Sequence, residues 1–108
     1  MTVNEYQDEA LKTKIYATSM NIIYPTLKLN GEAGEVAEKV GKTMRDKNGI
    51  FTDEIKLEIA KEIGDVMWYC SALSNDIGYT LDEICEMNIA KLQKRKAENK
   101  IHGSGDNR

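Results

Sequence analysis

The chain has 108 residues, which is enough for one compact domain and too few for two. Apolar residues make up 41% of the chain and charged residues 31%, a composition that excludes both a disordered chain and a membrane protein. The formal net charge of −3 disfavours a nucleic-acid polymer as partner, because proteins that bind phosphate backbones normally carry a basic surplus. The N-terminus lacks a basic, apolar leader, so we expect a cytoplasmic protein with no membrane partner.

The sequence predicts an all-α fold. Helix-forming residues dominate, and few runs alternate with the period of two that strands require. We expect four main helices packed as a bundle, over residues 2–19, 26–47, 52–77 and 80–100. Capping boxes at Thr2 and Thr80 and the terminator Gly78 support these bounds, and Pro25 makes residues 21–25 a connection. Residues 1–100 then form one domain, followed by a polar, glycine-rich tail over residues 101–108.

One short motif occurs twice. It reads Glu-x-Gly-acid-Val at residues 32–36 and again at residues 62–66. On a helical wheel, apolar stripes formed by residues 33, 36, 37 and 40 and by residues 63, 66, 67 and 70 are each bordered by two acids. If the two stripes pack in an antiparallel pair, four carboxylates converge at one edge of the helix interface: Glu32, Glu35, Glu62 and Asp65.

Such a cluster of carboxylates repels itself. Like charges one helical turn apart destabilise a helix by a few tenths of a kcal/mol per pair, and burying two such pairs together costs more. A hard divalent cation offsets this repulsion, and Mg²⁺ prefers carboxylate oxygens and water as ligands. The alternative from the residues alone is a pair of helices that pack without any ligand.

The last expected helix carries the opposite charge. Asn88, Lys91 and Arg95 share its inward face with apolar residues, where they must be satisfied or face a polar cavity. Next to metal-bound acids they suit a phosphate ligand; the alternative is that the two cations pair directly with the acids. Tyr69 follows Asp65 by one turn and is a candidate to stack on a base or ribose or to donate to a phosphate, whereas Trp68 projects to the far side and is expected at a subunit interface.

The repeated motif resembles the Glu-x-x-Glu and Glu-x-x-Asp signature of the MazG-like, all-α nucleotide pyrophosphohydrolases. The likeness extends to flanking segments at residues 24–27, 68–69, 88–95 and 103–108, and so covers most of the chain. The chain departs from the family's pattern at Lys28 and Asn30, where the family more often has small or apolar residues, so the local pocket is expected to differ.

This resemblance implies hydrolysis of a nucleoside triphosphate to the monophosphate and pyrophosphate, through water attack at the α-phosphate. It implies Mg²⁺, with Mn²⁺ as a substitute, on the four acids Glu32, Glu35, Glu62 and Asp65. Lys91 and Arg95 would stabilise the leaving oxygens and Asn88 would orient the substrate, while the general base is Glu35 or Glu38.

Family members assemble as dimers or as dimers of dimers, so the resemblance also implies a homo-oligomer. The sequence does not select a base or a sugar. Two other readings stay open at this point: a catalytically silent helical dimer that binds nucleotides or regulates a partner, and a purely structural bundle with surface acids.

Overall fold

The computed structural model describes residues 1–106, and these residues contain four α-helices, one short 3₁₀ helix and no strand. The all-α expectation with four main helices is therefore confirmed. None of the helices in this part of the chain is long and apolar enough to cross a membrane. The elements, in chain order, are α1 (Val3–Leu11), η1 (Thr18–Met20), α2 (Ile23–Asp46), α3 (Asp53–Asp76) and α4 (Leu81–Ala97).

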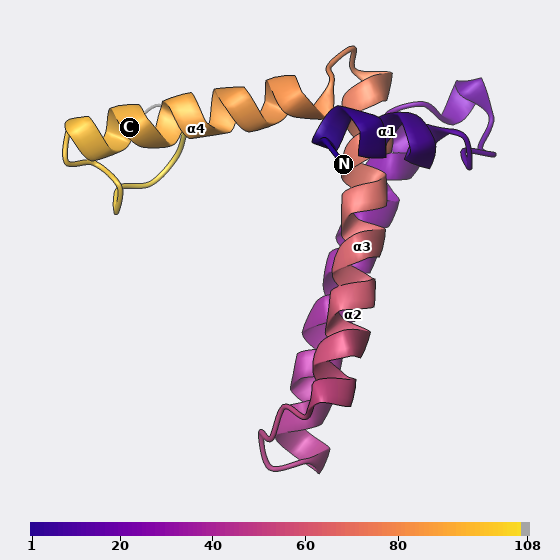
Figure 1. Ribbon diagram of the computed structural model, residues 1–108, viewed down its shortest axis with the longest axis vertical. Coiled ribbons are helices and arrows are strands. Elements are labelled where there is room, and N and C mark those ends of the chain that lie inside the picture. Colours follow the sequence, from indigo (N-terminus) through magenta and orange to yellow (C-terminus); the bar gives the residue numbers. More distant parts are fainter. Residues whose placement is uncertain (107–108) are drawn as a thin grey trace.

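The two longest helices, α2 and α3, form an antiparallel hairpin (Figure 1). Each has 24 residues and is therefore about 36 Å long. The turn between them contains Asn48 and Gly49, both with positive φ. Thr52 then caps α3 by accepting the Ile55 backbone N–H at 3.2 Å, as its position before Asp53 and Glu54 predicts.

The hairpin does not pack through the stripes that the helical wheel suggested. Residues at spacings of three and four form its partly buried faces, namely 25, 29, 32, 36, 39 and 43 on α2 and 55, 59, 62, 66, 69 and 73 on α3. Of the predicted apolar positions, Val36 and Val66 lie on these faces, whereas Val40, Ile63 and Met67 are exposed. The predicted faces were wrong because each helix carries two adjacent apolar stripes, and within a single chain the partner helix covers only one stripe of each.

The remaining helices meet at one end of the hairpin (Figure 1). Buried Gln7 on α1 joins three elements there, since its Nε2 donates to the Ser71 carbonyl at 3.1 Å and its Oε1 accepts the Leu81 N–H at 3.0 Å. Ala10, Ala72 and Leu81 are buried around it. From this junction α4 runs away from the hairpin, and the tail folds back along α4.

Three predicted helix bounds were wrong, and one of them is the end of the last helix, which lies at Ala97 rather than near residue 100. The first helix ends at Leu11 rather than near residue 19. The Thr13 hydroxyl donates a hydrogen bond to the Ala10 carbonyl at 2.7 Å, and this bond competes with the backbone hydrogen bonds that would continue the helix. The connection predicted for residues 21–25 is shorter, since α2 already begins at Ile23. Pro25 lies in the first turn of α2, where its missing N–H has no helical partner to lose.

Two glycine substitutions test this backbone. Gly41 lies inside α2 and a Cβ there meets no atom within 4 Å, so Gly41→Ala should raise the free energy of unfolding by about 1 kcal/mol. The melting temperature should rise by about 4–8 °C in thermal denaturation followed by circular dichroism. Gly78→Ala should do the opposite, because Gly78 ends α3 with a φ of 88° that alanine adopts only with strain. A loss of stability in Gly41→Ala would mean that another chain packs closely against this face of α2.

Candidate metal centre

Three carboxylates from the two hairpin helices converge near the middle of the hairpin. One oxygen each from Glu32 on α2 and from Glu62 and Asp65 on α3 lie within 4.8 Å of one another. Glu32 and Glu62 are half-buried on the facing stripes, and Asp65 is exposed at their edge. The spacing of three residues puts Glu62 and Asp65 on one side of α3, and the hairpin brings Glu32 opposite them.

This donor set fits a hard divalent cation. All the donors are carboxylate oxygens, which such ions prefer, and they come from two rigid helices. Among the ion pairs formed within residues 1–106, none involves Glu32, Glu62 or Asp65, so no lysine or arginine of the described chain neutralises the cluster by a direct contact. The negative charge of the cluster is thus available to an ion.

The other acids of the motif region lie outside this group. Glu35 is exposed on α2 and does not belong to the converging set. Glu38, one turn further on, binds Lys42 at 3.0 Å, and this hydrogen bond lowers the pKa of the Glu38 carboxyl. The structure therefore brings together three of the four acids that the sequence proposes as metal ligands, and neither of the two proposed as general base.

A pocket of about 680 Å³ adjoins the three carboxylates. Glu32 and Asp65 form part of its wall, and the rest of the lining is largely aromatic. The remaining lining residues come from the start of α2, from α3 and from the segment between α1 and α2: Thr13, Ile15, Tyr16, Met20, Tyr24, Trp68 and Tyr69. A hollow with aromatic walls and acids at one side is suited to a flat, partly polar ligand held next to a cation.

The aromatic rings of this pocket form a continuous series. The ring centroids lie 5.2 Å apart for Tyr16 and Tyr24, 6.2 Å apart for Tyr24 and Tyr69, and 4.8 Å apart for Tyr69 and Trp68. Burial, the neighbouring Tyr24 hydroxyl and the charges of Glu32 and Asp65 raise the pKa of Tyr69 to about 12. Its hydroxyl therefore keeps its proton at neutral pH and can act as a hydrogen-bond donor.

The position of Trp68 corrects the sequence analysis. It lines the pocket rather than facing away from it, and its indole N–H donates to the Thr13 hydroxyl at 2.8 Å and the Ala10 carbonyl at 3.2 Å. Tyr16 was missed as a site residue because the first helix was expected to continue to residue 19, and Tyr24 was missed because residues 21–25 were expected to be a connection. The available signal was the weaker helix formers that follow Leu11, namely Thr13, Ile15, Tyr16, Thr18 and Ser19.

The polar residues of α4 lie away from the carboxylates within one chain. Asn88 is exposed, and Lys91 and Arg95 both bind Asp106 of the tail, with nitrogen–oxygen distances of 2.9 Å and 3.3 Å. Arg95 also donates to the Gly105 carbonyl at 3.1 Å. These hydrogen bonds lower the pKa of Asp106. Because α4 runs away from the hairpin, the described chain brings neither cation to the acids (Figure 1).

Comparison with known proteins identifies the family. The profile of the MazG nucleotide pyrophosphohydrolase domain matches residues 25–99, which include α2 from Pro25 onward and all of α3 and α4. The chain is 43% identical over 114 aligned positions to the Gene 37 protein of Mycobacterium phage L5, with both chains covered completely. No solved structure matches it.

The chain therefore belongs to the MazG nucleotide pyrophosphohydrolase family, as the repeated motif indicated. Membership of this family supports the assignment of the protein as a hydrolase that acts on nucleotides. The matched region contains all three converging carboxylates.

Neutralising one acid tests the metal centre directly. Glu62→Gln should leave the metal-free melting temperature unchanged or slightly higher, because the substitution relieves repulsion with Glu32 and Asp65. It should also abolish the rise in melting temperature that Mg²⁺ or Mn²⁺ causes in the unchanged protein. Glu86→Gln, at an exposed position on α4, is the control and should keep the full response. A marked loss of metal-free stability in Glu62→Gln would assign the carboxylate a structural role instead.

Proposed function

We propose that this protein is a Mg²⁺-dependent nucleoside triphosphate pyrophosphohydrolase that releases a nucleoside monophosphate and pyrophosphate. The observation that carries the proposal is the convergence of Glu32, Glu62 and Asp65 beside an aromatic pocket, in a chain of the MazG family. The acids suit the phosphate end of such a substrate and the pocket suits its nucleoside end. An activity of this kind would operate in the cytoplasm.

In this proposal Glu32, Glu62 and Asp65 hold Mg²⁺, with Mn²⁺ as a substitute. When bound, the ion would neutralise phosphate charge and lower the pKa of a water molecule. The two hairpin helices keep the donor oxygens in place before the ion arrives, because Glu32 and Glu62 lie on the packed faces of α2 and α3.

The general base has two candidates, and the structure favours Glu35 over Glu38. A carboxylate on α2 takes a proton from the attacking water, whose oxygen bonds to the α-phosphorus as the bond to the bridging oxygen breaks and pyrophosphate leaves. Glu35 lies one turn after Glu32. Glu38 lies a further turn away, and its contact with Lys42 lowers its pKa and so makes it a weaker base.

The pocket supplies contacts for the nucleoside. The rings of Tyr16 and Trp68 offer faces for a base, and base–aromatic stacking contributes about 1–3 kcal/mol per base. Tyr69 lines the same pocket as Glu32 and Asp65, and its hydroxyl, which keeps its proton at neutral pH, would suit a ribose or phosphate oxygen.

We further propose that a second copy of the chain completes the site with Asn88, Lys91 and Arg95. Two features support this. The α4 helix extends away from its own hairpin (Figure 1), and the hairpin leaves Val40, Ile63 and Met67 between 37% and 47% exposed. An uncovered apolar face of this kind is typical of association surfaces. A homodimer, or a dimer of dimers, would cover this face and offer α4 of one chain to the acids of the other.

Incubating the protein with a panel of ribo- and deoxyribonucleoside triphosphates and Mg²⁺ tests the reaction. We expect pyrophosphate and a nucleoside monophosphate in equal amounts, and loss of turnover in Glu62→Gln and Asp65→Asn. Release of orthophosphate would move the attack to another phosphorus and overturn the mechanism. Quenching of Trp68 fluorescence by nucleotides without any turnover would favour the silent nucleotide-binding dimer.

Mixing two inactive variants tests the shared site. Asp65→Asn lacks a metal ligand and Lys91→Gln lacks a cation, so each alone should be inactive or nearly so. If one chain supplies the acids and its partner supplies Lys91, random mixed dimers should regain about a quarter of the unchanged activity, because half are mixed and each has one complete site. Mixing Asp65→Asn with Glu62→Gln is the control and should restore nothing. No recovery in the first mixture would place Lys91 outside the shared site.

A further inference from the structure

The segment over residues 12–22, between α1 and α2, forms one wall of the aromatic pocket. It supplies Thr13, Ile15, Tyr16 and Met20 to the lining. Except for the 3₁₀ turn Thr18–Met20 it contains no regular structure, so helical hydrogen bonds hold little of it in place. Its position depends on contacts with the rest of the molecule.

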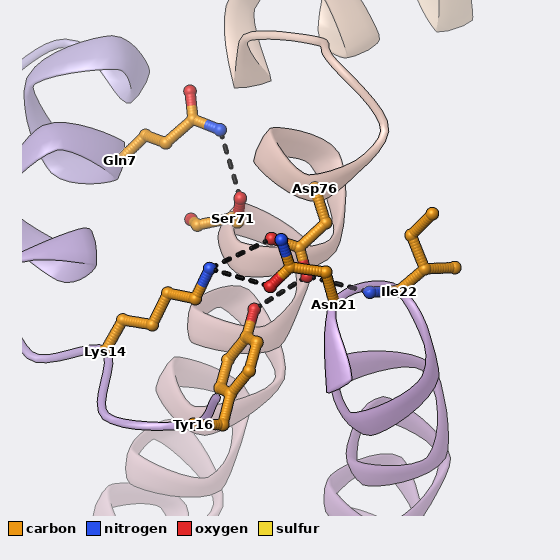
Figure 2. A network of polar contacts seen from close by, with 7 residues as sticks. All are labelled: Gln7, Lys14, Tyr16, Asn21, Ile22, Ser71 and Asp76. Atoms are coloured by element: carbon orange, nitrogen blue, oxygen red, sulfur yellow. Dashed lines mark hydrogen bonds and ion pairs between the residues drawn. The ribbon is translucent and has the colours of Figure 1, made fainter. Parts of the chain in front are cut away.

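The main polar anchor of this segment is Asp76, the last residue of α3. Its side chain is completely inaccessible to solvent and accepts three hydrogen bonds from the segment (Figure 2). The donors are the Tyr16 hydroxyl at 2.8 Å, the Ile22 backbone N–H at 2.9 Å and the Lys14 ammonium at 3.3 Å. Lys14 also donates to the Asn21 side-chain oxygen at 3.1 Å and lies 4.5 Å from the centre of the Tyr16 ring.

This anchor is charged at neutral pH. Burial by itself would raise the pKa of Asp76, but the hydrogen bonds from Ile22, Tyr16 and Lys14 outweigh burial and lower it. Burial and the hydrogen bond to Asp76 raise the pKa of Tyr16, so the Tyr16 hydroxyl stays protonated and continues to donate. The contacts are therefore charge-assisted hydrogen bonds, which are stronger than neutral ones.

The backbone at Ile22 is strained, and Asp76 holds it. Ile22 has φ 68° and ψ −50°, and the Ile23 N–H donates to the Asn21 carbonyl at 2.8 Å. This is the rarer, positive-φ form of the γ-turn, which is unfavourable for a β-branched residue. Such a conformation persists only where the surroundings enforce it, and the Ile22 N–H that points into the Asp76 carboxylate provides that contact.

Asp76 lies too far from the three carboxylates to take part in the metal centre. Asp76 follows Asp65 by eleven positions on α3, which corresponds to about 16.5 Å along the helix axis. Asp76 contacts the pocket instead through Tyr16. The Tyr16 ring packs on Tyr24, and Tyr24 packs in turn on Tyr69, which lines the pocket together with the acids.

We propose that Asp76 is a positioning residue, which holds residues 12–22 against α3 so that Tyr16 and Tyr24 form the wall facing the nucleoside part of the substrate. The proposal rests on the proposed function, because it assigns the nucleoside end to this pocket. It predicts that Asp76 governs nucleotide affinity without affecting the metal centre or the chemical step.

Steady-state kinetics of Asp76→Asn, with the best triphosphate of the panel and saturating Mg²⁺, test this. The amide keeps the size of the side chain but loses its charge, so we expect KM to rise about tenfold while kcat stays within about twofold. The Mg²⁺-induced rise in melting temperature should be unchanged. Asp8→Asn, on an exposed position of α1, is the control and should match the unchanged protein. A fall in kcat at constant KM, or no kinetic change, would overturn the proposal.

A second substitution tests the strain at Ile22. Glycine adopts positive φ without penalty, so Ile22→Gly in the Asp76→Asn background should return KM part of the way to its original value. If the double variant binds no better than Asp76→Asn alone, strain at Ile22 is not what Asp76 opposes. Should Asp76→Asn fail to fold, Tyr16→Phe removes only one of the three hydrogen bonds and should show a smaller rise in KM alone.

Fluorescence of Trp68, the one tryptophan of the chain, separates failure of this proposal from failure of the proposed function. Its indole donates to Thr13 of the segment, so release of the segment in Asp76→Asn should increase acrylamide quenching in the absence of nucleotide. Increased quenching in Asp76→Asn, in a protein whose unchanged form hydrolyses no triphosphate, would support the anchor and refute the hydrolase. Unchanged quenching would refute the anchor whatever the activity.

Discussion

The structure depends on the packing of α2 against α3 with acidic residues inside the contact. Glu32 and Glu62 occupy positions of the facing stripes that apolar residues would fill in an ordinary helical hairpin. At this level of the hairpin, apolar contact is therefore replaced by repulsion between carboxylates. Val36 and Val66, each one turn after one of these acids, supply apolar contact next to them. In the proposed function, helix packing that holds these like charges a few ångströms apart would prepare a cation site before the ion binds.

The end of the hairpin that meets α1 and α4 is reinforced by buried polar contacts rather than by a large apolar core. Gln7 joins α1 to α3 and to the start of α4, and Asp76 joins the end of α3 to the segment before α2. Both side chains are buried and use several hydrogen bonds each, so their partners must take up particular positions. Directional polar contacts of this kind specify how α1, α3, α4 and the segment before α2 are arranged.

The sequence was sufficient for the elements whose signals are local. Thr52, Thr80 and Gly78 mark helix ends through hydrogen bonds and backbone angles that depend on a few neighbouring residues, and the structure has those ends as predicted. The sequence also predicted that Glu32, Glu62 and Asp65 converge, but it did so from apolar stripes that the structure does not pack together, and it included Glu35 as a fourth member. Which of the two adjacent apolar stripes on each helix is buried could not be predicted from the sequence, because it depends on which face of the helix another element covers. The pocket wall at Tyr16 and the orientation of Trp68 depend in the same way on contacts with residues distant in sequence.

The tail of the chain shows what the cations of α4 are suited to bind. Lys91 and Arg95 lie one helical turn apart and hold the same oxygen of Asp106, and Arg95 is almost completely buried in doing so. Two cations converging on one oxygen form a site for an oxyanion, and a carboxylate occupies it within the single chain. A phosphate oxygen bound by the same two side chains has to displace Asp106. Contact between α4 and the acids of another chain would therefore be coupled to movement of the tail, because both events require the same two cations.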